Sequence, residues 1–255
     1  MSRANVADLL EMDVIYPVRP GDDNEELRYS LRSIAANFPH RRVWIVGYKP
    51  FWVTGCEYIP GNTGEYHANV YNNIRAAVEH PDVSDRVVIF NDDFFVTEPV
   101  AELPTYYRGT LAAHIAMPRV QRNRGWWLES LQTTMLCLQA HAIAAPLSYE
   151  LHVPLMVDRA CMAATLAQFR HVSPANPPQW RTLYCNMNRV DGEPRCDVKA
   201  YGKATSLHKP FHSTEDRFFP SFVNSLHELF TQPCRYELPG FVASGALALA
   251  TASAR

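Results

Sequence analysis

The sequence predicts one α/β domain in which helices flank a mostly parallel sheet. Short β-rich apolar segments alternate with amphipathic helical patterns through the first half of the chain, as they do in parallel sheets with crossover helices. The chain has 255 residues, 47% of them hydrophobic, which suffices for one sizeable buried core. Neither an internal repeat nor a linker divides the sequence, so we expect a single domain.

The first strand and helix give the clearest pattern. Residues 12–16 form an apolar β-rich segment, and a turn at Gly21 follows it. Asp23 or Asn24 can cap the next helix, where acidic side chains also suit the positive end of the helix dipole. Apolar residues then recur at steps of four and three, which gives this helix one buried face. That face consists of Leu27, Leu31 and Ile34.

The remaining elements follow from the same patterns. The segment 86–90 is almost entirely apolar and is therefore expected at the centre of the sheet. The other predicted strands span 42–47 and 111–117, and the other predicted helices span 65–80, 126–142, 158–169 and 219–230. Residues 241–255 are rich in Ala, Gly and Ser and are expected to form a frayed or mobile tail.

Composition excludes several classes of protein. The 24 basic and 26 acidic residues give a net charge of -2, which disfavours a protein that mainly holds the nucleic-acid backbone. The sequence contains no apolar run of membrane-spanning length, and its first residues lack the pattern of a secretory signal. Six cysteines occur without a CxxC pair, so we expect reduced thiols and a cytoplasmic protein.

The sharpest chemical signal is Asn91-Asp92-Asp93, directly after the predicted central strand. Ligands of open α/β sheets bind beyond the carboxyl ends of the strands. Two adjacent carboxylates there suit Mg²⁺ or Mn²⁺ bridging a diphosphate. The alternative is a simple Asx turn, but the following Phe94-Phe95 is expected to draw the loop inward.

Four segments resemble a known family in the family's own order. They are residues 13–34, with Asp-Val-Ile-Tyr, Gly-Asp and the helix from Glu26; residues 90–95; residues 149–154; and residues 213–237. Together they resemble the Stealth proteins, which are nucleotide-sugar-dependent transferases that include capsular-polysaccharide phosphotransferases. The chain departs from the family at 17–22, where the donor loop is altered, and at Glu215-Asp216, where an Asn-Asp pair is usual.

The resemblance implies a GT-A-like, Rossmann-like sheet and a role for each matching residue. Residues 1–240 would form the transferase domain, with a nucleotide-binding half over about 10–120 and an acceptor half over about 121–240. Asp92 and Asp93 would bind Mn²⁺ or Mg²⁺, with Asp216 completing the metal or acceptor side. His152 would be the general base, with Asp93 and Asp216 as its catalytic partners. The residues that would contact the nucleotide or the donor phosphates are Asp13, Arg28 and Arg181.

Several of these residues also have structural interpretations. His152 before Val-Pro is compatible with a purely structural histidine, Arg181 with a surface stack on Trp180, and Asp13 with a turn cap. Two further groups carry weaker signals. Trp126-Trp127 is either a sugar-stacking platform or part of the core, and His208, Lys209 and His212 form either an anion site or a solvated loop.

The predicted function is that of a metal-dependent glycosyltransferase that uses a UDP- or GDP-sugar and a hydroxyl acceptor on a glycan, a protein or a modified DNA base. Sugar-1-phosphate transfer of the Stealth type is the first alternative, and the altered donor loop favours glycosyl transfer over it. Two other classes remain open: a metal-dependent phosphodiester hydrolase or nuclease, because strand-end carboxylates also serve that chemistry, and a non-catalytic sugar-binding module.

Overall fold

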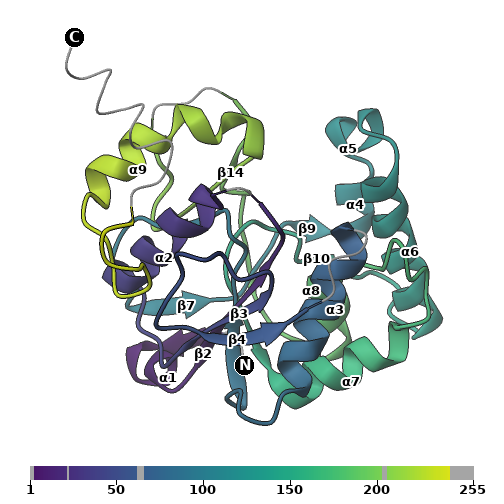
Figure 1. Cartoon of the computed structure of the whole chain (residues 1–255). Coiled ribbons are helices and arrows are strands. Elements are labelled where there is room, and N and C mark those ends of the chain that lie inside the picture. Colours follow the sequence, from purple (N-terminus) through teal and green to yellow (C-terminus); the bar gives the residue numbers. More distant parts are fainter. Residues whose placement is uncertain (1–2, 22, 62–65, 203–205, 242–255) are drawn as a thin grey trace.

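The computed structural model describes residues 3–21, 23–61, 66–202 and 206–241. A five-stranded sheet with the order β11-β5-β2-β3-β4 lies at its centre (Figure 1). Strands β5, β2, β3 and β4 are parallel, and β11 is antiparallel to β5 at one edge. The prediction of a mostly parallel sheet flanked by helices is therefore confirmed. These strands are β2 (Asp13–Val18), β3 (Val43–Gly47), β4 (Glu57–Pro60), β5 (Arg86–Ile89) and β11 (Leu155–Asp158).

Helices cover both faces of this sheet. Because side chains alternate along a strand, Tyr16 of β2 packs in a cluster with Leu31 of α2, whereas Ile15 packs in a second cluster with Ile74 of α3 and Met162 of α7. All five side chains are fully buried. The covering helices are α2 (Glu25–Asn37), α3 (Tyr66–Glu79) and α7 (Arg159–Phe169).

A smaller sheet continues from the turn after β5. Its order is β13-β14-β6, and its strand β6 begins at Phe94, so Phe94 and Phe95 are drawn into the core as expected. A short 3₁₀ helix and α9 close its outer side through an aromatic cluster around Phe222. These elements are β6 (Phe94–Val96), β13 (Lys199–Ala200), β14 (Phe211–Thr214), η1 (Asp216–Ser221) and α9 (Val223–Leu229).

On the other side of the molecule, residues 111–140 form a helical arm (Figure 1). The arm has its own apolar cluster, in which Leu111, Val120 and Leu131 pack together, and it rests on α8 through Leu183. Its helices, with α8, are α4 (Leu111–Ile115), α5 (Pro118–Arg122), α6 (Trp126–Ala140) and α8 (Trp180–Met187).

Short strand pairs and one small helix complete the described chain. The pairs are β1 with β7, β8 with β12, and β9 with β10. They comprise β1 (Arg3–Asn5), β7 (Glu102–Pro104), β8 (Tyr106–Tyr107), β12 (Glu193–Pro194), β9 (Gly109–Thr110) and β10 (Leu147–Ser148), and the helix is α1 (Val6–Leu10). Among the described residues, we find no helix with the length and apolar character needed to span a membrane.

Three local predictions need correction. The strand predicted over 111–117 is wrong, because α4 starts there and the Thr110 side chain accepts a hydrogen bond from the Ala113 N–H (3.1 Å) as its cap. Asn24 is the N-cap of α2, but its backbone is left-handed (φ 47°) and its amide instead donates to the Arg19 carbonyl (3.1 Å). The helix predicted over 219–230 is divided into η1 and α9, with Pro220 inside η1. The predicted tail, after Phe241, lies outside the described residues.

Candidate active site

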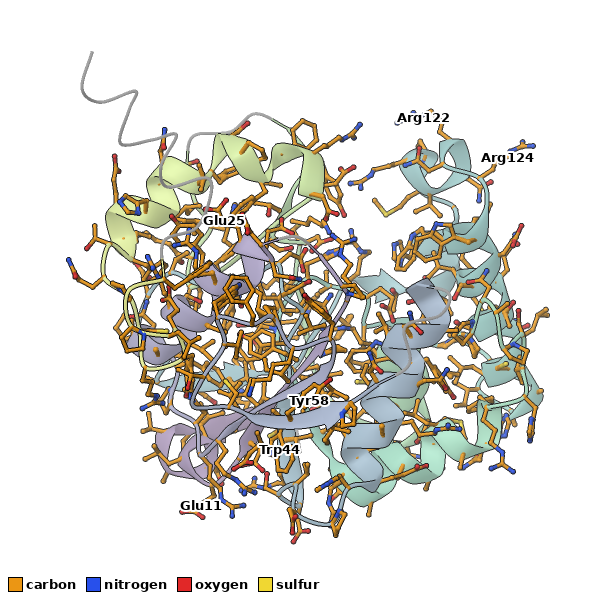
Figure 2. The ribbon with its side chains drawn as sticks, viewed as in Figure 1. Glu11, Glu25, Trp44, Tyr58, Arg122 and Arg124 are labelled. Carbon is orange, nitrogen blue, oxygen red and sulfur yellow. The ribbon has the colours of Figure 1, made fainter. Side chains whose placement is uncertain are left out.

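A cavity of about 510 Å³ opens beyond the carboxyl end of β5. The turn from Asn91 to Asp93 contributes to its lining, together with His152, Arg181 and Lys199. The helical arm lines another side of the cavity, and Figure 2 shows the arm's side chains reaching toward the rest of the molecule across this opening. The structure thus brings together five of the seven site residues predicted from the sequence: Asp92, Asp93, His152, Arg181 and Asp216.

Asp93 is buried and its charge is balanced. Its Oδ2 lies 3.1 Å from Lys199 Nζ and accepts a hydrogen bond from Ser213 Oγ at 2.8 Å. Burial alone would raise the pKa of Asp93, but the charges of Lys199 and His152 and these hydrogen bonds outweigh it and lower that pKa. Asp93 is therefore an anion at neutral pH and is already held by a protein cation.

Two other carboxyl groups of the site, those of Asp92 and Glu26, have raised pKa values, in contrast to Asp93. Burial and the negative charges of Asp93 and Asp216 raise the pKa of Asp92 to about 7. Burial and the same group of carboxylates raise the pKa of Glu26 to about 8, although Thr214 Oγ1 donates to Glu26 Oε1 at 3.1 Å. Asp92, Asp93 and Glu26 thus lie close enough together for each carboxylate to oppose the ionisation of its neighbours.

This group of hard oxygen donors suits a divalent cation in type and charge. Within the described residues, however, no group of three or more His, Cys, Asp or Glu side chains could hold a metal ion without other ligands. Asp216 is exposed at the start of η1, where it forms an ion pair with Arg19. The described side chains do not form a complete metal site on their own, and Asp92 and Asp93 could supply only part of a cation's ligands.

His152 forms a pair with Asp197, a residue that the sequence did not single out. His152 Nδ1 lies 2.9 Å from Asp197 Oδ2, and the His152 backbone N–H donates to Asp197 Oδ1 at 3.0 Å. Arg108 also binds Asp197 (2.6 Å). Although burial opposes it, the charge and hydrogen bonds of His152 lower the pKa of Asp197 well below its usual range. With Nδ1 engaged, Nε2 is the nitrogen of this partly exposed ring that a ligand can reach.

Arg181 lines the cavity and is buried (4% exposed). Its Nη1 donates to the Val153 carbonyl (2.7 Å), and its guanidinium lies 4.6 Å from the centre of a Trp180 ring and 5.4 Å from that of Phe94. Nη2 has no hydrogen-bond partner among the described residues. The stack on Trp180 is thus present, and Nη2 is an unsatisfied donor of a cationic group that is itself buried beside the cavity.

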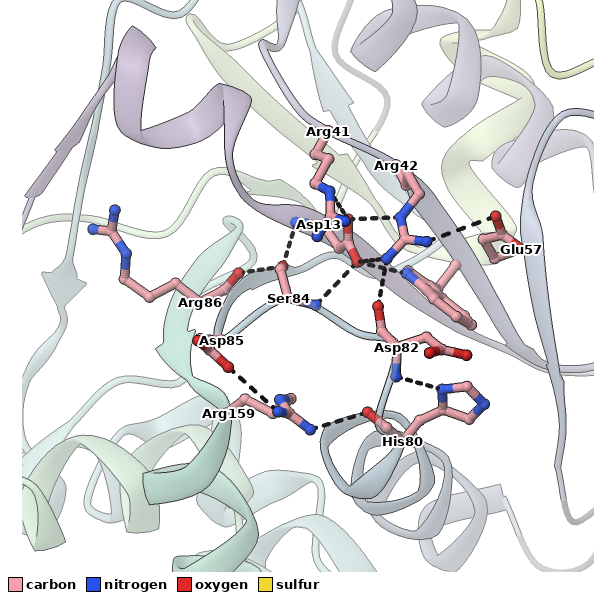
Figure 3. Close-up of polar contacts among 11 residues, drawn as sticks. Asp13, Arg41, Arg42, Glu57, His80, Asp82, Ser84, Asp85, Arg86 and Arg159 are labelled. Atoms are coloured by element: carbon pink, nitrogen blue, oxygen red, sulfur yellow. Dashed lines mark hydrogen bonds and ion pairs between the residues drawn. The ribbon is translucent and has the colours of Figure 1, made fainter.

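Asp13 does not reach the cavity, and its expected place beside a nucleotide is corrected. It is the first residue of β2, so it lies at the amino end of the sheet, whereas the cavity lies at the carboxyl end. Figure 3 shows its carboxylate beside donors from Arg42 and Ser84. Trp44 Nε1 donates to the same carboxylate. An acidic residue in an apolar strand is costly unless paired, and here the partners are structural.

Arg28 also lies outside the cavity lining. On α2, its side chain forms an ion pair with Glu25 (2.6 Å) and stacks over the Tyr29 ring at 4.9 Å. Its expected contact with the donor is therefore not supported by its position.

The two groups of residues with weaker sequence signals differ in whether they line the cavity. Trp126 and Trp127 both line the cavity, and Trp126 is 45% exposed. His212 is fully buried against Phe222, while Lys209 forms a surface ion pair with Glu98. The tryptophans therefore belong to the site, and the basic group before Asp216 does not form a common anion site.

Comparisons with known proteins identify the fold. No protein-family model and no curated protein matches this chain. Among solved structures, it is similar to the crystal structure of the galactosyltransferase LgtC in complex with donor and acceptor sugar analogues. The two chains share 10% identity with a TM-score of 0.50, over 93% of this chain and 99% of the other. The predicted GT-A-like fold is confirmed by this similarity, which at such low identity extends to the fold alone.

Proposed function

We propose that the protein is a glycosyltransferase that moves a sugar from a nucleoside-diphosphate donor to a hydroxyl group. The observation that carries the proposal is the His152–Asp197 pair, which shares one cavity with the carboxylates that follow β5. A transfer of this kind needs a base for the acceptor and positive charge for the leaving diphosphate. The cavity brings the residues for both to the carboxyl ends of parallel strands.

On the donor side, the diphosphate would lie between Arg181 and the carboxylates. Arg181 Nη2 is an unsatisfied donor, and a guanidinium matches phosphate oxygens better than an ammonium does. Asp92, with Asp93 and Asp216 beside it, would hold Mn²⁺ or Mg²⁺ together with diphosphate oxygens. The cation would neutralise the negative charge that develops on the leaving group.

On the acceptor side, His152 Nε2 would take the proton of the attacking hydroxyl as its oxygen bonds to the anomeric carbon and the bond from that carbon to the diphosphate breaks. Asp197 would hold Nδ1 and stabilise the imidazolium that forms. In this proposal, residues of both the 10–120 half and the 121–240 half bind the donor, and the 121–240 half supplies the base.

Sugar-1-phosphate transfer of the Stealth type is a second candidate, and the position of Arg181 favours keeping it. A guanidinium with a spare donor is equally suited to the oxygens of an attacked phosphorus. The same base would serve, but the released nucleotide would be a monophosphate rather than a diphosphate.

The test is to incubate the full chain with a panel of UDP- and GDP-sugars, with Mn²⁺ or with EDTA, and to separate the released nucleotides. Release of nucleoside diphosphate supports glycosyl transfer, and release of monophosphate supports the second candidate. Calorimetry should show weak donor binding in EDTA. Equal affinity in Mn²⁺ and in EDTA would remove the cation from the proposal, and turnover of phosphodiesters without a sugar would indicate a hydrolase.

A single variant tests the base. His152→Ala should lower turnover by roughly 10²–10⁴-fold with little change in donor affinity, because the base acts only on the acceptor. His141→Ala is the matched control, since His141 is exposed at the end of α6 and does not line the cavity. An unchanged turnover of His152→Ala would reduce His152 to a structural role.

A further inference from the structure

The charges around the cavity are strongly divided. The side formed by the turn after β5 and by η1 carries Asp92, Asp93, Glu215 and Asp216. The stretch that leads into the helical arm and forms its first part carries the opposite charge: from position 103 to 128 the sequence has no Asp or Glu. Over the same stretch it has four arginines, Arg108, Arg119, Arg122 and Arg124.

Three of these arginines have no carboxylate partner in the part of the chain that the structure describes. Arg108 is ion-paired with Asp197, but Arg119, Arg122 and Arg124 form no ion pair with any carboxylate of the described chain. Arg119 and Arg124 line the cavity, whereas Arg122 does not. Figure 2 shows Arg122 and Arg124 at the tip of the arm. Two uncompensated cations thus lie on the wall of the site, and a third lies outside it on the same short segment.

The arm cations lie beside the proposed base. The Arg119 guanidinium is stacked 2.9 Å from the centre of the Tyr201 ring, and the Tyr201 ring is 6.4 Å from the His152 ring. Trp126 adds an exposed aromatic face to the same wall. A ligand whose hydroxyl meets His152 Nε2 therefore has Tyr201 and Arg119 next to it, and Trp126 lines the same cavity.

We infer that this wall is an acceptor subsite for an acidic carbohydrate, that is, a sugar chain with a carboxylate or phosphate close to the reacting hydroxyl. The inference rests on the proposed function, because it names the acceptor class of that same site. Arg119 and Arg124 bind the anionic group, and Trp126 stacks on a sugar ring. A long nucleic-acid strand fits less well, because its continuous charge would meet the carboxylates on the opposite wall.

The test uses the full chain saturated with UDP and Mn²⁺ and titrated with two oligosaccharides of equal length, the carboxylated hyaluronan tetrasaccharide and neutral chitotetraose. We expect hyaluronan tetrasaccharide to bind at least tenfold more tightly. Arg119→Gln and Arg124→Gln should each weaken its binding by roughly tenfold, as the loss of one charged hydrogen bond does, and leave chitotetraose binding unchanged. Arg122→Gln is the matched control and should behave as the unmodified protein.

Other outcomes overturn the inference. Equal affinity for the two oligosaccharides, no binding of hyaluronan tetrasaccharide at millimolar concentration, or an equal loss in Arg122→Gln would each do so. Tighter binding of an eight-residue thymidine oligonucleotide would assign the wall to nucleic acid instead. Titration of UDP with Mn²⁺ alone separates this inference from the proposed function, because failure of UDP to bind contradicts the function, whereas UDP binding without the acidic preference contradicts only the subsite.

Discussion

The two ends of the central sheet both carry buried carboxylates, but their surroundings differ. At the amino end, Asp13 is fully buried and accepts hydrogen bonds from Arg42 Nη2 (3.0 Å), Trp44 Nε1 (2.8 Å) and the Ser84 N–H (3.1 Å). At the carboxyl end, Asp92 and Glu26 face like charges that raise the pKa of each. The amino end is satisfied by the protein itself, so it stabilises the fold (Figure 3). Carboxyl groups with strongly perturbed pKa values, as at the carboxyl end, are typical of functional sites.

Asp197→Asn should have the largest effect at the carboxyl end. We expect turnover to fall by about 10²–10⁴-fold, because the base loses the carboxylate that orients Nδ1 and stabilises its protonated form. The ascending limb of the pH–rate profile should also move to lower pH, which a merely structural role would not cause. Asp191→Asn, on an exposed loop, is the control. Activity reduced with an unshifted profile would limit Asp197 to a structural role.

Asp92→Asn should lower turnover by about 10²–10³-fold, the usual effect of removing one electrostatic stabiliser of the leaving group. Its thermal stability should not fall, because the carboxylate that is removed already faces Asp93 and Asp216. Parallel measurements of rate and melting temperature check both parts. A variant with unchanged turnover and a lower melting temperature would instead give Asp92 a structural role like that of Asp13.

Asp13→Ala should have the converse result. The substitution leaves Arg42, Trp44 Nε1 and the Ser84 N–H without their acceptor, and breaking a buried ion pair costs about 3–5 kcal/mol of unfolding free energy. Urea denaturation measures this loss, and donor affinity of the folded protein should stay within about twofold. If the fully folded variant bound the donor much more weakly, Asp13 would have a role in nucleotide binding after all.

Glu26→Gln gives the smallest effect and tests the repulsion between neighbouring carboxylates directly. The folded-state pKa of Glu26, about 8, lies above its ordinary value, so its contribution to stability is full at low pH and is lost as pH rises toward 8. Gln cannot ionise, so the variant does not lose stability in this way. The melting temperature of the variant minus that of the unmodified protein should therefore become larger from pH 5 to pH 8. Saturating Mn²⁺ should reduce this difference in melting temperature at pH 8. A difference that does not change with pH would contradict the repulsion between Glu26 and its neighbouring carboxylates.

The sequence was sufficient for the elements whose pattern is set locally. The alternation of strand and helix, the burial of Phe94 and the strand-end position of Asp92 all follow from residues close together in the chain. The helix at α4 did not, because Leu-Ala-Ala-His-Ile is compatible with either structure, and the Thr110 cap decides between them.

The partners of the site residues could not be predicted in the same way. Asp197 lies 45 positions from His152, and Lys199 lies 106 positions from Asp93, so only the assembled fold brings each pair together. Asp13 shows the reverse error: its acidic character was a valid signal of a paired carboxylate, and the segment 12–16 placed it near the start of its strand, but the family resemblance assigned it to the nucleotide at the opposite end.

The separate apolar cluster of the helical arm has a consequence for how such an enzyme can diversify. Leu111, Val120 and Leu131 pack with one another rather than with the central sheet, so exposed positions on the arm can change with little effect on the strand ends where the donor would bind. In the proposed function, acceptor recognition and chemistry therefore belong to separate parts of the molecule. Exchanging the surface of α5 and the residues up to Trp126 would then be a direct engineering route to a new acceptor preference with the proposed base unchanged.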